Sequence, residues 1–276
     1  ADPSTTAAVM DLGGASTQIV FEPTFPPASG SKLAPGEHVY DLDFAGRSHV
    51  LYQHSHLGYG LMQARRAVHN LVAFSYVWQS APKGNPIVWE DLTIEDRIHN
   101  PCLFKGETKV VELDPPGREK VKVTMVGTGA GFEACRRVVD VMLAKDAACE
   151  EPPCAFAGVY QPALGEVFSA GKVWALSYFY DRIAPLGLPS PFLISDLRKL
   201  TADVCSGPKS KAWSRFKKNK EAMEELSDRP EYCLDLTFEY SLLSLGYELE
   251  EEREIFTGKK AAGVELGWAL GAAIAM

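Results

Sequence analysis

A carboxylate, two glycines, a hydroxyl and an amide follow one another closely near the start of the chain, from Asp11 to Gln18. The octet reads Asp-Leu-Gly-Gly-Ala-Ser-Thr-Gln, and four apolar residues precede it at 7–10. The β-branched residues on its far side predict a strand, a tight turn at Gly13–Gly14 and a second strand. We expect the two glycines to supply backbone with positive φ and to let a ligand approach closely.

These residue types fit a phosphate bound beside a cation. Successive amides from Gly13 through Gly14 and Ala15 to Ser16 are expected to form an anion-binding concavity. Asp11, at the end of the first strand, is a candidate oxygen ligand for Mg²⁺, Ca²⁺ or Mn²⁺, directly or through water. On spacing alone, an ordinary β-hairpin is the alternative, in which these residues only make the turn.

The second strand adds a hydroxyl and an amide on one face. Alternation places Ser16 and Gln18 together, with Thr17, Ile19 and Phe21 on the other face. Ser16 and Gln18 would therefore point towards the turn, where they could hold an attacking water.

Composition narrows the class of protein. The chain has 276 residues, 46% of them hydrophobic, which is enough to bury one large domain or two lobes. A formal net charge of -8 argues against a nucleic-acid partner. No segment reaches the roughly 20 apolar residues of a membrane span, so we expect membrane attachment only through an anchor outside this chain.

Further elements surround the turn. Alternation predicts strands at 39–44 and 49–53, and helical spacing begins at Gly60. Ser55 lies between His54 and His56, but no third partner stands at a spacing that indicates a catalytic triad. The run at 127–131 precedes a predicted helix at 132–143, yet it is not the dinucleotide fingerprint, and a structural turn is favoured.

The octet resembles a signature of the apyrase and nucleoside diphosphatase family, within the superfamily of actin, hexokinase and heat-shock ATPases. Further segments resembling the family are Asn100–Leu103, Gly158–Pro162 and Gly267–Gly271, so the resemblance covers essentially the whole chain. The sequence Ser-Tyr-Phe-Tyr-Asp-Arg at 177–182 is similar to the guanosine/uridine diphosphatase branch, of the Golgi type.

The resemblance implies an α/β fold: a ribonuclease-H-like lobe with a mixed β-sheet, flanking helices and disulfides. Six cysteines, an even number, fit an oxidising compartment, although the count alone allows fifteen pairings. The family pairing implies Cys102 with Cys135, Cys149 with Cys154, and Cys205 with Cys233. The expected location is the secretory pathway, in the Golgi lumen.

The resemblance also implies a nucleotide site. Asp11 would anchor the metal, Gly13 to Ser16 would hold the phosphate, and Ser16 with Gln18 would orient the water. If the run at 177–182 is extended, alternation buries Phe179 and turns Tyr180 the other way, where its ring could stack on the nucleobase. Arg229 is a weaker candidate for the base, and Trp268 would pack beneath the nucleotide.

The implied reaction is metal-dependent hydrolysis of the terminal phosphate of GDP or UDP to the monophosphate, in support of lumenal glycosylation. The chain resembles only the C-terminal lobe of such an enzyme, with residues 1–276 as one lobe and the N-terminal lobe absent. That missing lobe carries the family's first phosphate loop and its general-base glutamate, so this polypeptide alone is expected to be inactive or poorly active.

Two alternatives stay open. An exopolyphosphatase-type enzyme shares a D-x-G-G-x-S turn, but usually has Glu in place of Gln18 and lacks the cysteine pattern. A non-catalytic nucleotide-binding protein of the actin-like superfamily would need no water-orienting Gln18.

Overall fold

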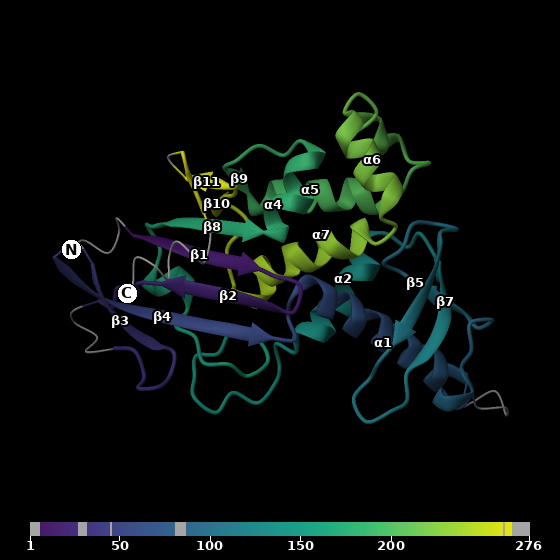
Figure 1. The fold of residues 1–276 in the computed structure, drawn as a ribbon, viewed down its shortest axis with the longest axis horizontal. Coiled ribbons are helices and arrows are strands. Elements are labelled where there is room, and N and C mark those ends of the chain that lie inside the picture. Colours follow the sequence, from purple (N-terminus) through teal and green to yellow (C-terminus); the bar gives the residue numbers. More distant parts are fainter. Residues whose placement is uncertain (1–5, 27–31, 45, 81–86, 262, 267–276) are drawn as a thin grey trace.

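Two larger sheets, a two-stranded pair and a group of helices make up the part of the chain that the structure describes (Figure 1). This computed structural model describes residues 6–26, 32–44, 46–80, 87–261 and 263–266. Over these ranges the larger sheet is mixed and seven-stranded. Its strands, in spatial order, are β3 (Val39–Phe44), β4 (Arg47–Leu57), β2 (Ser16–Phe21), β1 (Ala7–Leu12), β8 (Lys172–Ser177), β10 (Glu254–Phe256) and β9 (Phe192–Leu193).

The two strands of the predicted turn bury one face each. In β1 the side chains of Met10 and Leu12 are fully buried, and in β2 those of Ile19 and Phe21 are almost fully buried. Burial of one such side chain contributes about 1.5–3 kcal/mol. This hydrophobic contribution fixes the register, because a slip by one residue would turn the apolar set towards solvent. The predicted alternation is therefore confirmed.

The smaller sheet is built around an antiparallel hairpin. Its order is β5 (Arg97–Asn100), β7 (Val121–Gly127) and β6 (Thr108–Leu113), with β5 parallel and β6 antiparallel to β7. A Cβ on Gly127 would lie 1.8 Å from the carbonyl oxygen of Phe104, so this glycine permits close backbone packing. The run at 127–131 is thus a structural turn. A short antiparallel pair, β11 (Lys260–Ala261) and β12 (Val264–Glu265), completes the described strands.

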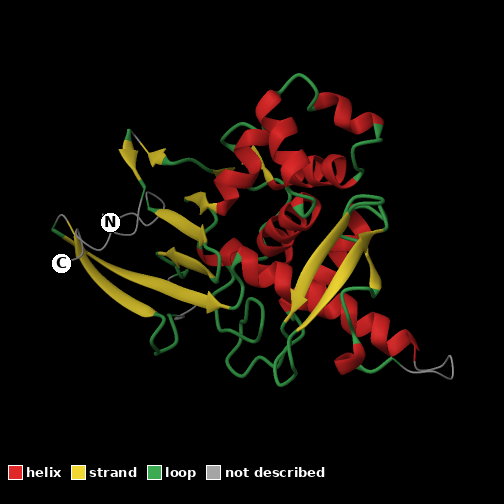
Figure 2. Cartoon of the chain, turned by 45° about the vertical axis from the view of Figure 1, so that its right-hand side comes forward, coloured by secondary structure: helices red, strands yellow, loops and turns green. Residues whose placement is uncertain are grey.

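The helices lie between and beside the sheets (Figure 2). They are α1 (Leu61–Ser80), α2 (Phe132–Leu143), α3 (Leu164–Val167), α4 (Tyr178–Ile183), α5 (Ile194–Cys205), α6 (Lys220–Asp228) and α7 (Tyr232–Ser241). Short helical turns are η4 (Trp89–Asp91), η5 (Ala184–Leu186), η6 (Lys211–Arg215) and η7 (Leu242–Gly246). None of the described helices is long and apolar enough to cross a membrane.

Helix α7 forms the centre of the helical layer. Every residue of α7 is buried, and the helix contacts α1, α2, α4 and α5. A helix buried on all sides is normally apolar throughout, yet α7 carries two carboxyl groups, Asp235 and Glu239.

Three disulfides cross-link the chain. They join Cys102 to Cys135, Cys149 to Cys154, and Cys205 to Cys233. These are the pairings that the family resemblance implies. The first links the loop after β5 to α2, and the third links α5 to α7.

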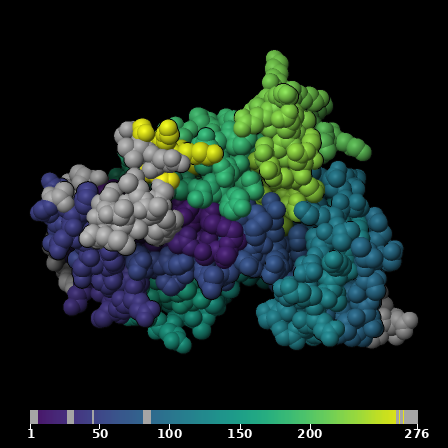
Figure 3. All heavy atoms as spheres, in the orientation of Figure 1, coloured from purple at the N-terminus to yellow at the C-terminus, as the bar shows by residue number. Residues whose placement is uncertain are grey.

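Several elements begin or end at one edge of the large sheet, where the carboxyl ends of its central strands lie. Strands β1 and β8 are parallel, with Leu12 opposite Ser177, so both end at this edge. Helix α4 begins directly after β8, and α1 begins beside the β1–β2 turn. In the space-filling view the purple N-terminal segment reaches the surface at the centre of the face (Figure 3). Ligands of open α/β sheets bind outside the carboxyl ends of strands, so this edge is the expected place for a site.

Candidate active site

The β1–β2 turn presents its amides in one direction. The carbonyl oxygens of Gly13, Gly14 and Ala15 accept backbone hydrogen bonds from Leu61, Met62 and Gly58, at 2.9, 3.0 and 2.9 Å. In a trans peptide the N–H points opposite to the carbonyl of the same plane. The amides of Gly14, Ala15 and Ser16 therefore point away from these donors at the β4–α1 junction, and such a set of amides is suited to an anion.

The amide of Gly13 has a different role from the one predicted. It donates to the carbonyl oxygen of Ser16 at 3.0 Å and so closes the hairpin. The expectation of positive φ at Gly13 and Gly14 is wrong, because neither belongs to the described glycines with that conformation.

A third glycine, Gly60, packs directly on the backbone of this turn. A Cβ on Gly60 would lie 2.4 Å from the backbone nitrogen of Ser16 and 2.5 Å from that of Ala15. Real Cβ atoms do not approach backbone so closely. Gly60 therefore lets the start of α1 pack directly on the turn.

Three polar residues of neighbouring strands share the open face of the sheet. Asp11 lies opposite Gln18 in the β1–β2 register, and Gln18 lies opposite Ser55 in the β2–β4 register. The Nε2 atom of Gln18 donates to the hydroxyl oxygen of Ser16 at 2.5 Å and to that of Ser55 at 3.0 Å. The structure thus brings together Asp11, Ser16 and Gln18, and it adds Ser55.

Ser55 could not be found from the spacing of residues 54–56. His54 and His56 project to the opposite face, which excludes a Ser–His pair. His56 is buried and stacks on Phe156 with ring centroids 4.2 Å apart. Burial, followed by the neighbouring His54, lowers the pKa of His56 to about 3, so this ring is neutral and structural.

The oxygen atoms on this face are suitable ligands for a hydrated divalent cation. They are the carboxylate of Asp11 together with hydroxyl and amide oxygens, which are hard ligands. Across the described ranges no group of three or more histidines, cysteines, aspartates and glutamates is placed to hold a metal. A cation at Asp11 would thus take most of its ligands from water and phosphate, as Mg²⁺ commonly does.

The aromatic segment after β8 is a helix rather than an extended run. Ser177 has φ 59°, which ends the strand, and α4 begins at Tyr178. Phe179 is fully buried as predicted, whereas the extended conformation predicted for this run is wrong. Tyr180 is half-buried, and the ammonium of Lys259 lies 5.4 Å from its ring centroid.

Arg229 and Trp268 are the two other residues predicted at the nucleotide. Arg229 follows the last residue of α6 and pairs with Glu225 of that helix. Trp268 lies outside the described residues. The roles of Tyr180, Arg229 and Trp268 at the nucleobase stay predictions.

A buried ion cluster ties the two helices of the site together. Asp235 of α7 accepts two hydrogen bonds from Arg65 of α1, at 2.6 and 2.5 Å, and one from Arg182 of α4 at 2.9 Å. Asp235 is fully buried. Since α1 begins beside the β1–β2 turn and α4 carries Tyr178 and Tyr180, Asp235 connects the two helices next to these predicted parts of the site.

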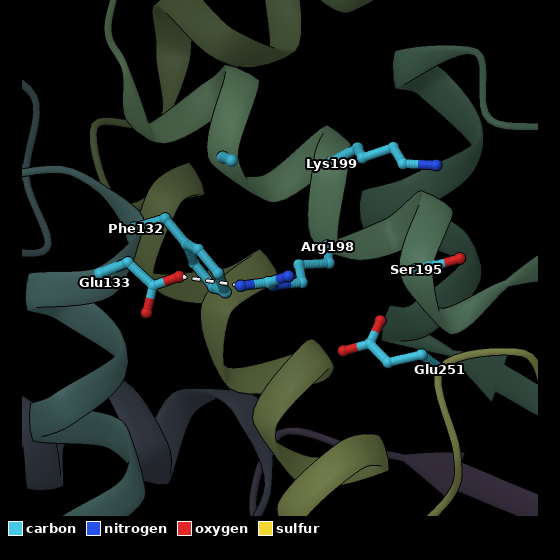
Figure 4. A pocket seen from close by; sticks show the side chains of 7 residues that line it. Phe132, Glu133, Ser195, Arg198, Lys199 and Glu251 are labelled. Carbon is cyan, nitrogen blue, oxygen red and sulfur yellow. Dashed lines mark hydrogen bonds and ion pairs between the residues drawn. The ribbon is translucent and has the colours of Figure 1, made fainter.

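A separate hollow lies between α2, α5 and the loop at 251. It is lined by Phe132, Glu133, Ser195, Arg198 and Glu251, among others, and Glu133 pairs with Arg198 at 3.3 Å (Figure 4). The hollow contains none of the predicted site residues.

The fold is a mixed sheet whose strand edge offers a carboxylate, a set of turn amides, and an amide held between two hydroxyls, which are groups suited to a phosphate and a cation. The chain belongs to the GDA1/CD39 (nucleoside phosphatase) family, whose pattern matches residues 1–276.

Individual relatives agree with this family membership. A probable guanosine-diphosphatase of Aspergillus fumigatus is 46% identical, over 99% of this chain and 54% of the relative. A guanosine-diphosphatase of Saccharomyces cerevisiae is 41% identical, over 98% of this chain and 51% of the relative. The chain thus spans about half the length of the curated relatives it matches.

A solved structure supports the fold. The crystal structure of nucleoside triphosphate hydrolases from Neospora caninum superposes with a TM-score of 0.57 at 17% identity, over 97% of this chain and 56% of that chain. At this identity the likeness concerns the fold alone. The predicted α/β lobe with a mixed sheet and flanking helices is confirmed.

Proposed function

We propose that the chain is the C-terminal lobe of a nucleoside diphosphatase that hydrolyses GDP or UDP to the monophosphate and orthophosphate. The observation that carries the proposal is the contact of the Gln18 amide with the Ser16 hydroxyl, beside turn amides that point away from α1. The guanosine-diphosphatase names of the relatives favour a nucleoside diphosphate as substrate.

The chain's own residues bind the phosphate and position the water. Amides of Gly14, Ala15 and Ser16 hold the terminal phosphate and stabilise the charge that develops on it. Ser16 and Gln18 hold the water in line with the bond to be broken. Asp11 would hold a divalent cation (Ca²⁺, Mn²⁺ or Mg²⁺) through its water shell, and the ion would supply neutralising charge for the phosphate oxygens.

The other half of the site comes from an N-terminal lobe. Water must lose a proton when it attacks phosphorus, and the family resemblance implies that the accepting glutamate belongs to the preceding lobe. We therefore propose that the chain alone has little or no activity. Its length, about half that of its relatives, supports this proposal.

The three disulfides support a place in an oxidising compartment, and we propose the secretory pathway and the Golgi lumen. They also weigh against the exopolyphosphatase-type alternative, which lacks this cysteine pattern. A protein that only binds nucleotide would not need the contact between Gln18 and Ser16, because it has no water to position.

The test compares the chain alone with a joined protein, in which the part of the Aspergillus fumigatus relative that the chain does not cover is added to it. Phosphate release is measured from GDP, UDP, ADP, GTP and polyphosphate, with each cation and with a chelator. We expect metal-dependent release from GDP or UDP by the joined protein, a strongly reduced but measurable release in its Gln18→Ala variant, and little release by the chain alone.

Other outcomes decide against parts of this proposal. Release from polyphosphate in preference to nucleotides would favour the exopolyphosphatase-type reading. Nucleotide binding by the joined protein without turnover would favour the binding-protein alternative. Full activity of the chain alone would overturn the half-site proposal.

A further inference from the structure

Ser55 makes a contact that the octet does not supply. It lies 37 residues after Gln18 in the sequence, on β4, and the strand register places the two residues opposite each other. The Ser55 hydroxyl oxygen accepts a hydrogen bond from Nε2 of Gln18 at 3.0 Å. Ser55 is exposed on the open face, so its side chain contributes nothing to the hydrophobic core.

In the structure the Gln18 amide faces both serines through its nitrogen. A glutamine amide has two N–H donors on Nε2 and one acceptor oxygen, Oε1. Ser16 and Ser55 accept from Nε2, so both donors are engaged. The remaining atom, Oε1, is then the one offered to a water, and an oxygen is what a water's hydrogen needs as partner.

We propose that Ser55 is a positioning residue for hydrolysis, which holds the Gln18 amide in the orientation that presents Oε1 to the attacking water. The inference rests on the proposed function. Ser55 does not touch the substrate; it acts through Gln18. Without its hydroxyl, only Ser16 holds the amide, and orientations with Nε2 towards the water become populated.

The kinetic test uses the joined protein and three variants of one strand. Ser55→Ala is expected to lower kcat for GDP on the order of 3- to 10-fold, since one neutral hydrogen bond is lost, with KM unchanged. Ser55→Thr, which keeps a hydroxyl, should restore most of the rate. Ser48→Ala is the matched control, because Ser48 is an exposed serine on β4 that bonds to Asp43 and not to Gln18.

A double-mutant cycle asks whether Ser55 acts through Gln18. In a Gln18→Ala background, Ser55→Ala should cause no further loss of kcat, because neighbouring residues that act together are not additive. An equal loss in both backgrounds, or an unchanged kcat in Ser55→Ala, would overturn the proposal.

A second measurement needs no activity and so separates this inference from the proposed function. The side-chain NH₂ signals of Gln18 in the chain, identified by their loss in Gln18→Ala, are followed by NMR. In Ser55→Ala they should move towards the positions of a solvated glutamine and exchange faster with water, while Ser48→Ala leaves them in place. Unchanged signals in Ser55→Ala would refute the contact even if the joined protein hydrolyses no nucleotide; changed signals in an inactive joined protein would sustain the contact and refute the proposed function.

Discussion

Gly60 packs on the backbone of Ser16 so closely that an added Cβ would lie 2.4 Å from its nitrogen. The contact couples the start of α1 to the β1–β2 turn through backbone alone. Ser16 belongs to the octet, whereas Gly60 comes 44 residues later, in a segment whose helical spacing carries no sign of this contact.

Gly60→Ala is expected to displace the turn. Overpacking of a tight contact costs roughly 1–3 kcal/mol of stability, and misplacement of catalytic groups by about 1 Å lowers the rate about 100-fold. The measurements are urea unfolding of the chain and GDP hydrolysis by the joined protein. Gly165→Ala is the control, because a Cβ there meets nothing within 4 Å. A Gly60→Ala variant with the parent rate would contradict the role assigned to this contact.

The buried cluster predicts a large loss of stability in Asp235→Ala. Removal of this acceptor leaves two guanidinium groups, Arg65 and Arg182, without their carboxylate, at side-chain exposures of 16% and 8%. Such losses are about 3–5 kcal/mol, and they are measured as the change in unfolding free energy in urea. Asp203→Ala breaks the exposed pair with Arg215 instead and should cost about 1 kcal/mol or less. Equal effects of the two variants would show that the cluster does not hold α1 and α4.

Glu239 predicts an unusual dependence of stability on pH. Its side chain is fully buried, neither carboxyl oxygen has a hydrogen-bond partner within the described part of the chain, and burial, followed by the charge of Asp235, raises its pKa well above 4.5. Above pH 4.5 the unfolded chain releases this proton while the folded chain keeps it, so stability falls as pH rises.

The Glu239→Gln variant removes this proton linkage. We expect its unfolding free energy to exceed that of the parent at pH 7–8 and the difference to shrink towards pH 4.5. The exposed Glu224→Gln variant is the control and should follow the parent. A Glu239→Gln variant less stable than the parent at pH 8 would mean that the carboxylate is ionised and stabilised by the arginines.

The buried ring of His56 predicts that stability rises with pH in the acid range, opposite to the effect of Glu239. Its folded pKa of about 3 lies below the 6.5 of the unfolded state. As the pH falls below 6.5, His56 takes up a proton in the unfolded chain but stays neutral in the folded chain. The free energy of unfolding therefore decreases as the pH is lowered from 6.5 to 3. His56→Phe keeps the stack on Phe156 and should reduce acid destabilisation between pH 6 and 4. His99→Phe, at an exposed site, should not; identical acid profiles for both variants would contradict the assignment.

The local parts of the site follow from the sequence, and the distant contacts do not. The alternation in residues 7–21 is enough to place Ser16 and Gln18 on the open face. The pairing of Gln18 with Ser55 depends on which strands are neighbours, and the ion pair of Arg65 with Asp235 spans 170 residues. Ser177 ends its strand through a backbone conformation that its residue type does not signal, which is why the helix after it could not be predicted.

Tyr180 provides the last prediction, because its role at the nucleobase is so far a sequence inference. Loss of a stacked base costs about 1–3 kcal/mol, so Tyr180→Ala should weaken GDP binding to the joined protein by roughly 5- to 150-fold while leaving pyrophosphate binding unchanged. Isothermal titration with both ligands separates base contacts from phosphate contacts. Tyr178→Ala is the matched comparison, since the Tyr178 ring already packs against Arg182, 5.0 Å from its centroid. If Tyr178→Ala selectively weakens GDP binding and Tyr180→Ala does not, the stacking residue is Tyr178. If both variants weaken pyrophosphate binding equally, the loss arises from the β1–β2 turn and neither ring holds the base.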